Sequence, residues 1–184
     1  LEGATIGIIG LGRIGSTVAR RLAGWEPRLL AYDPYITSQR AQQFGAELVD
    51  WATLLTESDV VTVHCPLTSE THHMLDAAAL GRLRPGAILI NTARGPIVDE
   101  TALVHALTSG QLWAAGLDVT EQEPLSADSP LLALDNVILT PHVAAYSPQA
   151  REDLYRMTCE IAIQVLSGET PESAVNLDAL AARG

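Results

Sequence analysis

The stretch ATIGIIGLGRIG, residues 4–15, decides the fold, because a short apolar run passes directly into a glycine-rich turn. The turn, GLGRIG at 10–15, follows the first predicted strand and precedes the first predicted helix, so its backbone amides and the helix dipole would face an anion. Gly10 permits a tight turn, Gly12 lets the backbone approach a pyrophosphate, and Gly15 lets the helix pack closely on the strand. Taken alone, the motif also fits a turn that is rich in glycine by chance.

Short apolar runs alternate along the chain with segments of helical pattern, which predicts an α/β fold with a doubly wound parallel sheet, the Rossmann arrangement. The runs are almost continuously apolar, as expected when helices cover both faces of a sheet. The expected strands are 4–10, 28–33, 59–65, 86–92, 114–119 and 136–140. The expected helices are 13–24, 37–44, 50–56, 76–82, 99–109 and 147–167.

We expect one domain and the beginning of a connection to another. The 184 residues, 47% of them hydrophobic, can bury a full core. The chain begins without Met just before an apolar strand, which is typical of a fragment cut at a domain edge. We therefore predict a nucleotide-binding domain over residues 1–168 and a return segment toward a largely absent second domain over residues 169–184.

The composition excludes several classes of partner. A formal net charge of −11 argues against binding to nucleic acid or to an anionic membrane surface. No apolar run is long enough to span a bilayer, and no signal peptide is visible. Cys65 and Cys159 show no pairing or zinc pattern and are expected to be free thiols. These features predict a cytoplasmic protein.

Asp33 indicates which dinucleotide would bind. It ends the second predicted strand, roughly 20 residues beyond the glycines, where a carboxylate accepts hydrogen bonds from an adenosine ribose and repels a 2′-phosphate. This position favours NAD over NADP. A simple turn-forming Asp before Pro34 is the alternative.

Four further segments resemble, in order and spacing, the D-2-hydroxyacid dehydrogenases, and the resemblance covers nearly the whole chain. They are HCPLTSETHHMLD (64–76), LRPGAILINTARGPIVDETAL (83–103), AAGLDVTEQEP (114–124) and NVILTPHVAAYS (136–147). His64-Cys65, His72-His73 and the run at 142–150 are most similar to phosphoglycerate-dehydrogenase-like proteins and the C-terminal-binding-protein corepressors. Ala145 stands where the corepressors have Trp.

The resemblance implies a catalytic set of Arg94, Glu123 and His142. An imidazole titrates in the range needed to move a proton to or from the 2-oxygen of a hydroxy acid. A carboxylate would orient and stabilise the imidazolium, and a guanidinium would hold the substrate carboxylate with a planar fork of donors. Taken singly, each residue also has an ordinary interpretation as a loop residue, but all three follow predicted strand ends, where such sheets place their sites.

The resemblance also implies cofactor contacts beyond the glycine turn and Asp33. Asp118 is expected at the nicotinamide carboxamide, and Arg94 and His142 are expected to touch the cofactor as well. The remaining expected contacts are Arg13, Ile14, Cys65, Pro66, Thr92, Ala93 and Ala144. No metal is expected, since adjacent histidines such as His72 and His73 point apart on most backbones.

The family's activity is hydride transfer between NAD and a small 2-hydroxy acid or 2-keto acid, by homodimers whose second domain closes over the cofactor. The chain alone is therefore expected to turn over slowly or not at all. Two alternatives stay open at this point: an NAD(H)-sensing, corepressor-like binding module without significant turnover, and another kind of enzyme with a borrowed NAD-binding fold. Which 2-hydroxy acid is used is not indicated.

Overall fold

The computed structural model describes residues 2–175 and contains two compact units, one that ends at Ala144 and one that begins at Ala145. The predicted domain that extends to residue 168 stays a prediction. Residues 176–184 of the predicted return segment lie outside the described residues.

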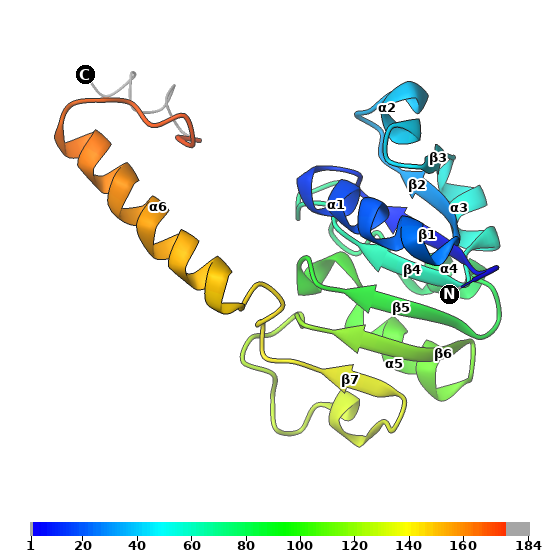
Figure 1. Cartoon of the computed structure of the whole chain (residues 1–184). Coiled ribbons are helices and arrows are strands. Elements are labelled where there is room, and N and C mark those ends of the chain that lie inside the picture. Colours follow the sequence, from blue (N-terminus) through cyan, green and yellow to red (C-terminus); the bar gives the residue numbers. More distant parts are fainter. Residues whose placement is uncertain (1, 176–184) are drawn as a thin grey trace. The chain divides into compact units, whose positions relative to one another are not determined.

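The first unit is built on a seven-stranded sheet whose paired strands are all parallel, in the order β3-β2-β1-β4-β5-β6-β7 (Figure 1). The strand order reverses between β1 and β4, which is where sheets of this kind open a crevice at their carboxyl ends. This topology confirms the predicted doubly wound α/β fold. The strands are β1 (Thr5–Ile9), β2 (Arg28–Tyr32), β3 (Ala46–Leu48), β4 (Val60–Val63), β5 (Ala87–Asn91), β6 (Leu112–Leu117) and β7 (Val137–Leu139).

Four of the five α-helices of this unit begin at a short polar side chain that accepts a hydrogen bond from a free backbone amide, whereas the first follows Gly12 without such a cap. Asp50, Asp76 and Asp99 each cap a helix by accepting from the amide three residues ahead, at 2.7–2.9 Å. The helices of this unit are α1 (Arg13–Leu22), α2 (Ser38–Gln42), α3 (Trp51–Glu57), α4 (Ala77–Arg82) and α5 (Glu100–Thr108), with short 3-10 turns η1 (Ala23–Trp25), η2 (Gly95–Ile97) and η3 (Pro130–Ala133). All five α-helices lie within or close to the predicted ranges.

One strand was not predicted. β3 has only three residues and follows shortly after α2. Its apolar run is so short that the sequence pattern resembles the end of a helix. Its pairing with β2, from Leu29–Ala46 to Ala31–Leu48, makes it the edge strand of the sheet. Tertiary pairing, and not local pattern, therefore decides its conformation.

Two apolar clusters pack against the sheet. One joins α1 and α2 to β1, β2 and β3 and includes Ile6, Ile8 and Ala19. The other joins α3, α4 and α5 to the remaining core strands and includes Ile9 and Leu54. Neighbouring residues of β1 serve opposite clusters, as the period of two in a strand requires.

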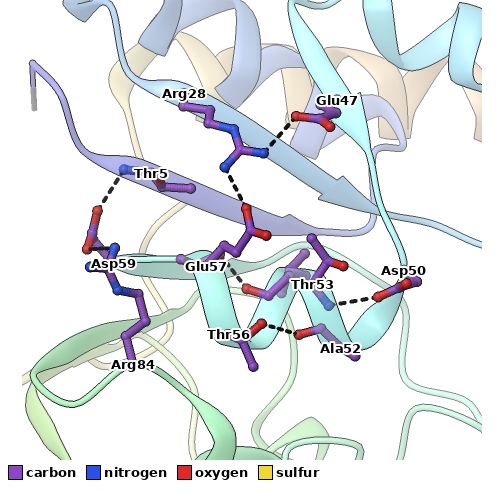
Figure 2. A network of polar contacts seen from close by, with 12 residues as sticks. Thr5, Arg28, Glu47, Asp50, Ala52, Thr53, Thr56, Glu57, Asp59 and Arg84 are labelled. Atoms are coloured by element: carbon purple, nitrogen blue, oxygen red, sulfur yellow. Dashed lines mark hydrogen bonds and ion pairs between the residues drawn. The ribbon is translucent and has the colours of Figure 1, made fainter.

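Ion pairs tie the amino ends of the strands together (Figure 2). Asp59, just before β4, accepts from the Thr5 amide at 2.8 Å and from Arg84 at 2.7 Å. Arg28, the first residue of β2, reaches Glu57 at 2.6 Å and Glu47 at 3.0 Å. These side chains are about half exposed, so each pair stabilises the fold only modestly. They lie at the edge of the sheet opposite the carboxyl ends of the strands.

The second unit contains α6 (Pro148–Leu166), which Ser147 caps by accepting from the Ala150 amide at 3.0 Å. Its bounds agree with the predicted helix to within one residue. No helix within residues 2–175 has the length and apolar character needed to cross a membrane.

We predict that Leu54→Ala lowers the free energy of unfolding by about 2–5 kcal/mol, because this α3 side chain is fully buried and its loss leaves a cavity. Leu132→Ala is the matched control, since Leu132 is 57% exposed and should change stability by less than about 0.5 kcal/mol. Chemical denaturation of both variants measures the difference. Equal losses would contradict this placement of the core.

Candidate cofactor and catalytic site

The glycine turn leaves no room for a side chain at two of its three glycines, Gly10 and Gly15. Gly10 has φ +86°, and a Cβ there would lie 2.7 Å from the amide nitrogen of Cys65 at the end of β4. A Cβ on Gly15 would overlap the carbonyl oxygen of Gly10. Gly12, which precedes α1, faces open space within 4 Å of the position of a Cβ. The helix N-terminus is therefore uncovered, and its geometry fits an approaching pyrophosphate.

Asp33 lies directly beside this turn. Its Oδ2 accepts from the Leu11 amide at 2.9 Å, and its Oδ1 accepts from the Tyr35 amide at 3.0 Å. A carboxylate has about four acceptor positions, so both oxygens can still accept from a ribose diol. The carboxylate is thus held in place before any ligand binds.

Two cavities lie on either side of the β4 end and share His64, Cys65 and Pro66. The cavity next to Asp33, of about 210 Å³, is lined without Lys or Arg and suits an adenosine moiety. Its walls include Gly10, Gly12, Asp33, Tyr35, Glu70 and Thr71. The other, of about 550 Å³, is lined by Arg13, Ile14, His64, Cys65, Pro66, Leu67, Thr92, Ala93 and Arg94. Most of the expected cofactor contacts therefore line one continuous region.

The remaining expected residues lie outside the linings of these two cavities. They are Asp118, Glu123, His142 and Ala144, which follow β6 and β7. Gly15 is also absent from the linings, since it packs against the strand as predicted from the motif.

His64 contributes to the family resemblance but was not predicted as a site residue, yet it lines both cavities. Its Nε2 lies 2.9 Å from the hydroxyl of Thr62, and burial lowers its pKa, so it is an uncharged imidazole near neutral pH. Burial raises the pKa of its neighbour Cys65 to about 11. A thiol with that pKa stays protonated, which agrees with a packing role for Cys65.

Asn91 holds the turn that carries Arg94. The side chain of Asn91 is buried; its Oδ1 accepts from the Ala93 amide and its Nδ2 donates to the Arg94 carbonyl, each at 3.0 Å. Both polar atoms of the amide are used on this turn. Sequence reasoning missed Asn91, although a polar residue at the end of an apolar strand was the available signal.

Glu123 and His142 form a hydrogen-bonded pair. Glu123 Oε2 lies 2.8 Å from His142 Nδ1, and Glu123 Oε1 accepts from the Thr120 amide at 3.2 Å. The hydrogen bond from His142 is the main reason that the pKa of Glu123 is lowered, and the charge of Arg94 adds to the effect. The carboxylate is therefore ionised at neutral pH, and the charge of Arg94 acts on the same group.

Asp118 organises the turn that carries His142. Its Oδ1 accepts from the Thr140 hydroxyl and, at 2.8 Å, from the Val143 amide, while its Oδ2 accepts from the Ala144 amide at 2.8 Å. Burial alone would raise the pKa of Asp118, but these hydrogen bonds outweigh burial and lower it. His142 itself has φ +55°, a strained backbone conformation. The hydrogen bonds to the Asp118 carboxylate hold the turn in this conformation. The expected contact of Asp118 with nicotinamide stays a prediction.

The expectation that His72 and His73 point apart was wrong. Their ring centroids lie 4.0 Å apart, because His73 has a left-handed backbone with φ +50°. His73 Nε2 pairs with Glu121 at 2.7 Å. Within residues 2–175, no group of three or more His, Cys, Asp or Glu side chains is arranged to hold a metal ion.

Comparison with known proteins identifies the family. Residues 1–144 match the family described as "D-isomer specific 2-hydroxyacid dehydrogenase, NAD binding domain". D-3-phosphoglycerate dehydrogenase of Archaeoglobus fulgidus is 46% identical over 180 residues, which are 98% of this chain and 34% of that protein. Glyoxylate reductase of Korarchaeum cryptofilum is 45% identical over 181 residues, 98% of this chain and 54% of that protein. The crystal structure of the TT0316 protein from Thermus thermophilus matches with a TM-score of 0.88 and 40% identity, over 95% of this chain and 54% of that one.

The chain belongs to the D-isomer-specific 2-hydroxyacid dehydrogenase family and corresponds to its NAD-binding domain. This result confirms the resemblance drawn from the ordered motifs, including the similarity to phosphoglycerate dehydrogenases, and it confirms NAD as the cofactor. The chain spans only 34% and 54% of the length of the two curated relatives.

We predict that Asp118→Asn destabilises the protein by about 1–3 kcal/mol at pH 7, because the new amide nitrogen cannot accept from the donors that the lost oxygen served. A carboxyl whose folded pKa is lowered stabilises the fold above its unfolded pKa, about 3.9, and loses that contribution as the pH falls through the folded pKa. The difference between wild type and variant should therefore shrink below about pH 4.

Denaturant unfolding across this pH range measures the difference. Asp76→Asn is the matched control, since Asn caps a helix about as well as Asp and this variant should stay close to wild type. A constant difference at all pH values would show that the charge of Asp118 does not hold the turn.

Proposed function

We propose that this chain forms the NAD-binding half of an enzyme that transfers a hydride between NAD and a small D-2-hydroxy acid or its 2-keto acid, acting on the CH–OH group of the donor. The observation that supports this most is the Glu123–His142 hydrogen bond, with Arg94 close enough to lower the pKa of Glu123. An acid/base group, its carboxylate partner and a cation thus meet at the carboxyl ends of the strands. The names of two relatives, D-3-phosphoglycerate dehydrogenase and glyoxylate reductase, agree with this class of substrate.

Each of the three side chains has one chemical task. His142 Nδ1 faces Glu123, which leaves Nε2 to give a proton to the 2-oxygen of a keto acid or to take one from a hydroxy acid. Glu123 orients the ring and stabilises the imidazolium that forms. Arg94 lines the larger cavity and can hold the substrate carboxylate through two parallel hydrogen bonds. The nicotinamide, when bound, donates or accepts the hydride.

The cofactor would lie along the two cavities. We propose that the uncovered N-terminus of α1 binds the pyrophosphate near Arg13 and Ile14, that Asp33 binds the adenosine ribose, and that Thr92 and Ala93 line the nicotinamide end. His64 would present an uncharged imidazole at the junction of the cavities.

We further propose that turnover requires a second, substrate-binding domain, since the relatives are much longer than this chain. Such a domain would exclude water and position the substrate, so the isolated chain should bind NADH but show little or no turnover. A homodimer stays a prediction from the family, to be tested by light scattering.

We predict that the chain binds NADH better than NADPH and that Asp33→Ala weakens NADH binding by about tenfold while reducing this preference. The reason is that the carboxylate accepts from the ribose diol and repels a 2′-phosphate. Fluorescence titration with each nucleotide gives the four dissociation constants. Asp135→Ala, which removes an exposed acid elsewhere, should change neither nucleotide's affinity; unaltered preference in Asp33→Ala would reject the assigned role.

We predict that Arg94→Ala lowers kcat/KM for keto acids by about 100-fold or more in the enzyme completed by a substrate domain, and that Arg94→Lys recovers only part of the loss. NADH oxidation with glyoxylate, hydroxypyruvate, pyruvate and bulkier 2-keto acids measures this effect. Arg21→Lys, in the last turn of α1, is the control for a lost guanidinium. Tight NADH binding without turnover of any acid would instead favour the NAD(H)-sensing module.

A further inference from the structure

His73 has a backbone conformation that glycine adopts more easily. Its φ is +50°, and its amide donates to the Pro96 carbonyl at 2.8 Å in the turn that follows Arg94. Two residues on, the Leu75 amide donates to the Ile97 carbonyl at 3.1 Å. The β4–α4 loop, which also carries Cys65 and Pro66, is thus joined to the Arg94 turn. A residue other than glycine keeps this strained backbone conformation only where surrounding contacts offset the strain.

The imidazole of His73 makes that contact with Glu121. Glu121 Oε1 lies 2.7 Å from His73 Nε2 and also accepts from the Glu100 amide at 3.0 Å. In return, the Glu121 amide donates to Glu100 Oε2 at 3.2 Å. The His73 and Glu121 side chains are only 37% and 35% exposed, so solvent screens the pair less than it screens a fully exposed one. Glu121 is held at both its backbone and its carboxylate.

Glu121 belongs to the same short turn as Glu123. The Thr120 amide donates to Glu123 Oε1 at 3.2 Å, and the Thr120 hydroxyl donates to the Gln122 carbonyl at 2.8 Å. The carbonyl of Thr120 packs so closely on Gly95 that any side chain at that position would overlap it. Thr120 is thus held by its packing on Gly95 and by its peptide bond to the anchored Glu121, and its amide orients the carboxylate that meets His142.

We propose that the His73–Glu121 side-chain contact is a brace that holds Glu123 against His142, and that His73 and Glu121 are positioning residues for the hydride transfer. The brace connects the loop that lines the cofactor cavities to the turn that carries the carboxylate. Its effect on turnover rests on the function proposed above, whereas its effect on the geometry of Glu123 does not.

The decisive test uses Glu121→Ala in the 184-residue chain, with the pKa of the Glu123 carboxyl measured by carbon-13 NMR titration. Removing a neighbouring negative charge by itself would lower this pKa. Loosening the Glu123–His142 hydrogen bond would instead raise it toward the value of a free glutamate, about 4.3. The brace requires a rise. An unchanged or lowered pKa overturns the proposal.

His72→Ala is the matched control, because His72 stacks on His73, is exposed and is not part of the His73–Glu121 contact. It should leave the Glu123 pKa and the NADH affinity at their wild-type values. A rise as large as that in Glu121→Ala would assign the effect to loop packing and would overturn the brace.

His73→Gly separates positioning from folding, since glycine relieves the left-handed strain. In the enzyme completed by a substrate domain, we expect kcat to fall about tenfold, with the KM for NADH within about twofold and Tm no lower than that of wild type. A fall in Tm without a fall in kcat would show a merely structural role. Failure of wild type to bind NADH would reject the proposed function, whereas the Glu123 titration alone decides whether the brace exists.

Discussion

The close approach of backbone to backbone at the end of β1 is the constraint on which the rest of the site depends. Gly10 lies against the end of β4, and Gly15 lies against the carbonyl of Gly10, so neither position can carry a side chain. This contact lets α1 begin directly over the strand and brings β1 and β4 together where the strand order reverses. Both cavities and the hydrogen-bonded carboxylate of Asp33 lie at this point.

The two edges of the sheet have different physical tasks. At the amino ends, half-exposed ion pairs such as Arg28–Glu57 and Arg84–Asp59 add modest stability (Figure 2). At the carboxyl ends, the side chains of Asn91 and Asp118 are buried and are used on backbone turns. The side chains of Asn91 and Asp118 fix the conformations of the turns that present Arg94 and His142.

Much of the fold could be predicted because its signals are local. The glycine turn and the continuous apolar strands each reflect a short-range requirement of the backbone. β3 escaped prediction because three residues carry too little pattern, and only pairing with β2 decides their state. The rings of His72 and His73 were misjudged because the left-handed conformation of His73 arises from contacts with a distant turn.

The sequence by itself determined the parallel α/β class, the glycine-rich turn after the first strand, the cofactor and the family, because glycine spacing, apolar periodicity and ordered motifs can be read from the residues without their contacts. Only the tertiary structure decided which polar groups meet. Glu123 reaches His142, Asp118 reaches the His142 turn, and Glu121 reaches His73. These three contacts join segments that follow different strands, and parallel strands bring their carboxyl ends together only after the whole sheet has formed.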